Sequence, residues 1–155
     1  MDAITLLRDD HKTLRKLTSD LADTTERAVE TRKKLLDRIE AFLKAHTTIE
    51  EELFYPAYIA ASDGDIEAKR QVAEGVEEHR AADRKVIPDL RKNDPSTVQW
   101  SGDAKVLKDY VFHHLGEEEE EIFPKMRELM KPAELKKLGE AMLARKEELL
   151  AQERA

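Results

Sequence analysis

Histidine is rare in this chain, and its placement is the feature that most suggests chemistry. Four of the five histidines form two pairs that share one spacing of 68 positions, as 79 − 11 and 114 − 46 show. A glutamate follows the second histidine of each half by four residues, and these two glutamates keep the same spacing. The repeated set is therefore two lone histidines, His11 and His79, and two His-x-x-x-Glu pairs, His46 with Glu50 and His114 with Glu118.

These residue types and spacings favour a site for two metal ions. Residues four apart lie on one face of a helix, so each His-x-x-x-Glu pair can direct both side chains at one point. Four imidazoles and two carboxylates suit iron or manganese, and this ligand type also allows zinc. We expect each ion to take two histidine nitrogens, with both glutamates and a solvent-derived oxo or hydroxo group bridging the pair. Such a shell leaves a coordination position open for a small ligand.

The alternative is that these residues have no shared function. A single His-x-x-x-Glu is also an ordinary surface contact on a helix, and a solitary histidine is more often structural. Chance accounts poorly for four of five histidines at one spacing. A duplicated helix pair without function would not retain polar side chains on an apolar face, so we favour the metal site.

The elements that would position these side chains are helices. Segments 46–56 and 114–124 align without gaps, as do 9–12 and 77–80, which divides the chain into two helix pairs, 1–62 and 66–130. Apolar periodicity, turn signals and Asp2 as a helix cap predict five helices. Their expected bounds are about 2–27, 30–60, 66–92, 102–130 and 132–152. Pro56, Pro88 and Pro124 fall late in three of them and should bend or end each helix.

The expected fold is therefore all-α. Short connections favour antiparallel neighbours and an up-down-up-down four-helix bundle over residues 1–131. The C-terminal helix, within 132–155, lacks ligand-type residues, and we expect it to cover the bundle or to form a dimer contact.

Composition narrows the function classes. The chain has 155 residues, enough for one domain with its own core, and no cysteine, which excludes disulfides, iron–sulfur clusters and thiol catalysis. A net charge of −7 without a basic stripe argues against nucleic acid and anionic membranes as partners. The sequence shows neither a signal peptide nor a long uncharged apolar run, so we expect a cytoplasmic protein.

Through these motifs the chain resembles bacterial hemerythrin-like proteins of the HHE cation-binding family, over about residues 3–130. The resemblance implies a non-haem di-iron centre in a hemerythrin-like bundle, with Glu50 and Glu118 as bridging carboxylates. It also implies small partners such as O2, hydrogen peroxide and nitric oxide. The family is associated with O2 carriage, O2 or redox sensing, iron handling and reactions of peroxide. The ligands that the resemblance implies are His11, His46, Glu50, His79, His114 and Glu118.

One departure from the family pattern bears on function. Oxygen-carrying hemerythrins have a His-x-x-x-His pair on the third helix, whereas the residue four after His79 is Asp83. Loss of this imidazole favours peroxide or other redox chemistry, including catalase-like decomposition, over reversible O2 carriage, sensing or iron handling. Ferritin-type chemistry is disfavoured because no acidic residue stands three positions before any histidine.

Four further residues are candidates for the surroundings of the site. Asp83 is a sixth-position ligand, a hydrogen-bond acceptor for a ligand, or a surface residue. Tyr110 packs in the core or lines the open position, and Glu117 leans toward the ligand face. His113 points about 100° away from His114, so we expect it to be dispensable and exposed or at the edge of the site. The aromatic residues Tyr55, Tyr58 and Trp100 are expected to pack, and the protein is expected to be a monomer or a weak homodimer.

Overall fold

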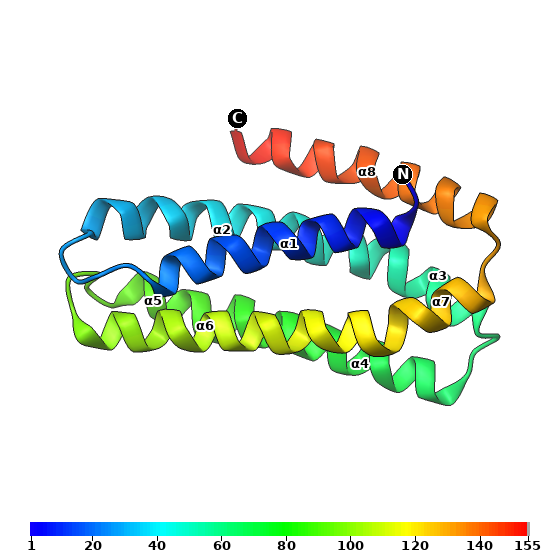
Figure 1. The fold of residues 1–155 in the computed structure, drawn as a ribbon, viewed down its shortest axis with the longest axis horizontal. Helices are drawn as coiled ribbons and strands as arrows, with labels where there is room; N and C mark the ends of the chain where they lie inside the picture. Colours follow the sequence, from blue (N-terminus) through cyan, green and yellow to red (C-terminus); the bar gives the residue numbers. More distant parts are fainter. Residues whose placement is uncertain (155) are drawn as a thin grey trace.

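The computed structural model describes residues 1–154, and within them the chain is helical and has no strand. Four long rods lie side by side, and a fifth helix lies along one side of them (Figure 1). The rods contain single π-helical turns, labelled η. In chain order the elements are α1 (Ala3–Ala22); α2 (Val29–Ile49), η1 (Glu50–Phe54) and α3 (Tyr55–Ala61); α4 (Ile66–Ala81), η2 (Ala82–Val86) and α5 (Ile87–Lys92); α6 (Val98–Glu117), η3 (Glu118–Ile122) and α7 (Phe123–Leu129); and α8 (Pro132–Arg154).

The predicted all-α bundle is confirmed, but two helix ends were predicted wrongly. The first rod ends at Ala22, because the following turn is held by the fully buried Arg32, which donates to the Thr24 backbone and side chain. The fourth rod begins at Val98 and not near 102. The Thr97 side chain accepts a hydrogen bond from the Trp100 backbone N–H and so caps the helix at this earlier position.

The three prolines within the rods do not end them. In each case one residue separates a π-helical turn from the proline. The backbone N–H of that residue donates to the carbonyl five positions earlier, as the Tyr55 N–H does to the Glu50 carbonyl. Proline offers no N–H and crowds the carbonyl four residues earlier, which a wider turn relieves. The turns η1 and η3 begin at Glu50 and Glu118, so two of the predicted ligands stand where the helices depart from regular α geometry.

The buried apolar side chains form two clusters, and the polar site lies between them. One cluster gathers near α3, α7 and α8 and includes Leu7 and Phe123. The other fills the opposite part of the bundle around Leu14, Leu107 and Trp100. On α1, His11 lies between Leu7 of the first cluster and Leu14 of the second, and on the fourth rod Glu118 lies between Leu115 of the second cluster and Ile122 of the first.

Helix α8 covers the bundle, which was one of the two expectations for it. It packs on α1 and α2 along one side of the bundle (Figure 1) and buries Leu135 and Met142. The approach is close at Gly139, where an added Cβ would lie only 2.3 Å from the Met1 carbonyl oxygen. Among residues 1–154, no helix has the length and apolar character that crossing a membrane requires.

Candidate metal centre

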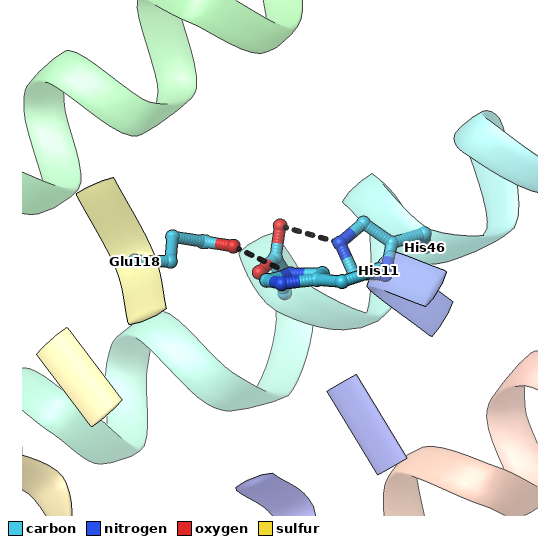
Figure 2. Close-up of side chains that lie close together, drawn as sticks. His11, His46 and Glu118 are labelled. Carbon is cyan, nitrogen blue, oxygen red and sulfur yellow. Dashed lines mark hydrogen bonds and ion pairs between the residues drawn. The ribbon is translucent and has the colours of Figure 1, made fainter. Parts of the chain in front are cut away.

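The six predicted ligands converge in the middle of the bundle, and four rods contribute them. Figure 2 shows the side chains of His11, His46 and Glu118 pointing toward one another, although they come from α1, α2 and η3. Their potential ligand atoms form two groups that share Glu50, with all atoms of a group within 4.8 Å of one another. We call the group of His11, His46, Glu50 and Glu118 the inner position, and the group of His79, His114 and Glu50 the outer position.

Both glutamates reach the two positions at once. Glu50 Oε1 lies 3.4 Å from His46 Nε2 and 3.1 Å from His79 Nε2. Glu118 places Oε1 3.1 Å from His11 Nε2 and Oε2 3.7 Å from His114 Nε2. Each carboxylate thus contacts one imidazole of each half, as the predicted bridging role requires.

Two buried atoms of this cluster have no hydrogen-bond partner. They are His46 Nε2 and Glu50 Oε2, both on side chains with no solvent exposure. Leaving a buried polar atom unpaired costs about 1–3 kcal/mol, so such atoms call for a partner. A cation would pair with both of them, and the nitrogen and oxygen donor set suits iron or manganese. The residues therefore fit a pair of metal ions.

A carboxylate holds the outward-facing nitrogen of every histidine in the cluster. Each imidazole Nδ1 lies 2.6–2.9 Å from a carboxylate oxygen, which fixes the ring and directs Nε2 into the site. The pairs are His11 with Glu119, His46 with Asp10, His79 with Glu51, and His114 with Glu78.

Sequence reasoning missed these four supporting carboxylates, although a signal was present. Each stands next to a predicted ligand in the chain, and the four obey the same 68-residue spacing, Asp10 with Glu78 and Glu51 with Glu119. The repeat therefore includes the hydrogen-bond partners of the histidines as well as the histidines themselves.

The four residues named as candidates for the surroundings lie at the margin. Asp83 is exposed, on the rim of a hollow of about 330 Å³ that also borders His79. His113 is 67% exposed and binds Glu117 at 2.8 Å, away from the buried cluster. Tyr110 is half-buried and borders a small hollow beside His79 and His114.

Tyr55 packs in the core as predicted, and it also takes part in the polar cluster. Its hydroxyl donates to Glu118 Oε2 at 2.8 Å, and its ring stacks on His79 with centroids 5.8 Å apart. Gly75 makes room for it, since a Cβ at that position would lie 2.7 Å from the Tyr55 hydroxyl oxygen. The phenol is thus part of the polar cluster.

Burial and neighbouring charges shift the pKa values of this cluster. Burial raises the pKa of Tyr55 well above its usual range, and the carboxylates of Glu118 and Glu50 raise it further, so the hydroxyl keeps its proton. Burial alone would lower the pKa of His46, but the carboxylates of Glu50 and Asp10 outweigh it and the net shift is upward. The pKa of His79 and that of His114 are raised in the same way, against burial, by surrounding glutamates.

The carboxylates shift in the opposite direction. Burial would raise the pKa of Glu50, but the charge of His46 and hydrogen bonds from His114 and His79 hold it well below its usual range. The pKa of Asp10 is likewise lowered against burial, by His46 and Lys146. Without metal, the protonated forms of His46, His79 and His114 are therefore favoured, and metal binding must release those protons.

Comparison with known proteins agrees with this geometry. The family model of the hemerythrin HHE cation binding domain matches residues 2–126. The chain is also similar to the crystal structure of a hemerythrin HHE cation binding domain-containing protein from Mycobacterium kansasii. The TM-score is 0.84 at 27% sequence identity, and the match covers 98% of this chain and 89% of that one. No curated protein matches the chain significantly.

Proposed function

The chain belongs to the family of hemerythrin HHE cation-binding domains, and from this premise we propose that it is a non-haem di-iron protein that reacts with O2, hydrogen peroxide or nitric oxide. The observation that carries the proposal is the buried cluster of four imidazoles around two glutamates, with two of its atoms lacking a partner. We include in the proposal an oxo or hydroxo group that bridges the two ions.

The side chains divide into those that hold the ions and those that hold the ligands. In the proposed centre, His11 and His46 hold one ion, His79 and His114 hold the other, and the shared glutamates span both. Two bound irons would supply redox chemistry that the side chains lack, with an open coordination position for a small molecule. The Tyr55 hydroxyl lies among the ligands and donates a hydrogen bond to one of them, Glu118.

The charge around the site favours redox turnover over reversible carriage. Every ligand imidazole donates its Nδ1–H to a carboxylate, which makes the ring a stronger electron donor and favours the more highly charged ion. Asp83, which stands where oxygen carriers have a fifth imidazole, is exposed and outside the buried cluster. Catalase-like decomposition of hydrogen peroxide is redox turnover of this kind. In this reaction one hydrogen peroxide is oxidised to O2 while a second is reduced to water.

The test is metal analysis followed by rapid mixing. We expect two irons per chain, oxidation of the reduced protein by O2 without a long-lived oxygenated form, and O2 evolution when peroxide is added to the oxidised protein. The zinc-loaded protein is the control and should evolve no O2, because zinc has no redox chemistry.

Two results would contradict the proposal at different levels. One metal per chain, or zinc alone after expression with ample iron, would exclude the di-iron centre. A stable oxygenated spectrum that is lost under vacuum and regained with O2 would instead support reversible carriage or sensing.

A further inference from the structure

The two metal positions differ in their access to small molecules. We infer that an external ligand binds at the outer position, in the small hollow beside Tyr55 and Gly75, and that it is a small neutral molecule that accepts a hydrogen bond. This inference rests on the di-iron function proposed above and assigns the place where that function is carried out.

The first observation is the exposure of the histidines at the two positions. The side chains of His11 and His46 are 0% exposed, whereas those of His79 and His114 are 6% and 9% exposed. A metal site with some access to solvent retains room for an exogenous ligand.

The second observation is free space beside His114 of the outer position. A hollow of about 10 Å³ lies beside His114 and is also bordered by Tyr55, Gly75 and Glu118. This volume holds about one water molecule, and so about one diatomic or peroxide-sized ligand once the neighbours adjust. Tyr55 borders the hollow, and its hydroxyl, which donates to Glu118 Oε2 in this structure, would turn to donate to such a ligand.

The third observation is that the 68-residue repeat fills the equivalent place at the inner position. Gly75 corresponds to Leu7, and Tyr55 corresponds to Phe123. Leu7 is fully buried, and Phe123 stacks on His11 with ring centroids 5.3 Å apart. A leucine and a phenyl ring thus occupy the inner side, where the outer side has a hydrogen atom and a phenol.

The charge at the hollow selects the class of ligand. Its other lining residues include the acidic side chains Glu74, Glu78, Glu117 and Glu121. Carboxylates at the mouth disfavour entry of anions. The hollow therefore favours O2, nitric oxide or hydrogen peroxide over small anions.

Nitric oxide is the probe, because it is neutral, diatomic and has a spectrum when bound to ferrous iron. The experiment measures its affinity for the reduced, iron-loaded protein and for Gly75→Ala, with Gly116→Ala as the matched control. An added Cβ at Gly116 meets no atom within 4 Å, whereas one at Gly75 intrudes on the hollow and on Tyr55. We expect Gly75→Ala to weaken nitric oxide binding by about tenfold or more, and Gly116→Ala to leave it unchanged. Equal affinity in Gly75→Ala and the parent overturns the inference.

A second variant and a structure protect the test against a misfolded Gly75→Ala. Tyr55→Phe keeps the hollow and removes only the hydroxyl, so the affinity should fall by about fivefold through loss of one hydrogen bond. An unchanged affinity in Tyr55→Phe would contradict the assigned place. In crystals of the reduced protein exposed to nitric oxide, the ligand should lie on the outer ion against Tyr55. A ligand on the inner ion, or bridging both ions, overturns the inference while the di-iron function stands, whereas fewer than two ions per chain overturns the function itself.

Discussion

Replacing Asp10 by asparagine should weaken both the metal site and the docking of α8. The Asp10 carboxylate is 1% exposed and accepts two hydrogen bonds, from His46 Nδ1 at 2.9 Å and from Lys146 Nζ at 2.5 Å. These contacts join α1, α2 and α8 through a single charged group. Asparagine keeps the size of the side chain and removes its charge, so Asp10→Asn isolates the electrostatic part of the network.

The magnitude follows from burial. Breaking a fully buried ion pair by removing one partner costs about 3–5 kcal/mol. The Lys146 side chain is 15% exposed and also lies over the Phe42 ring, at 4.7 Å, so we expect a smaller loss of about 2 kcal/mol in the metal-free protein. For metal affinity, loss of a carboxylate that orients a ligand histidine costs about 10–100-fold.

Two measurements separate these effects. Urea unfolding of the metal-free protein gives the change in stability, and competition with a chelator gives the change in metal affinity. The exposed neighbour provides the control, since Asp9→Asn should change neither quantity. Lys146→Met should lower stability while it leaves the hydrogen bond to His46 in place. Metal affinity equal to that of the parent in Asp10→Asn would refute the claim that Asp10 orients His46.

Two further predictions concern the ligands. The raised pKa values of the outer histidines and His46 stabilise the metal-free fold at pH values below the ordinary histidine value, and this contribution is lost as the pH rises through the folded-state pKa. Metal binding instead requires unprotonated imidazoles, so the Tm difference between loaded and metal-free protein should widen from about pH 6 to about pH 8; a constant difference would contradict the assigned pKa shifts. His114→Ala should lose metal from the outer position while His113→Ala keeps both ions, as metal analysis would show; loss of metal in His113→Ala alone would mean that the side chain at 113 holds it.

Much of the fold and the convergence of six side chains could be predicted because both depend on local patterns. Helical periodicity fixes which residues share a face, and the common spacing of His46 and His114 aligns the two halves before any contact is known. In a four-helix bundle, the helix face that carries a His-x-x-x-Glu motif in each half is expected to face the interior. The convergence of Glu50 and Glu118 follows from the same reasoning.

What could not be predicted depends on contacts between distant segments. The early end of α1 depends on Arg32, which also donates to the Pro95 carbonyl far along the chain. The supporting carboxylates were hidden by composition, because 34 of 155 residues are acidic and a solvated glutamate looks the same in sequence as a paired one. The counterpart of Tyr55 in the repeat is Phe123, which indicates aromatic packing at both positions. The hydrogen bond from the Tyr55 hydroxyl to Glu118 joins distant segments, so the sequence does not reveal it.

The departures from the repeat explain how a symmetric scaffold produces two unlike metal positions. The carboxylates behind the inner histidines are each paired with a cation, Lys146 with Asp10 and Arg15 with Glu119. Those behind the outer histidines, Glu51 and Glu78, form ion pairs only with histidines among residues 1–154. The outer position is thus the more negative of the two, and it is also the one with free space beside it. Negative surroundings favour a more highly charged ion, so an iron bound at the outer position would be the better suited of the two to give up an electron to the small molecule proposed to bind there.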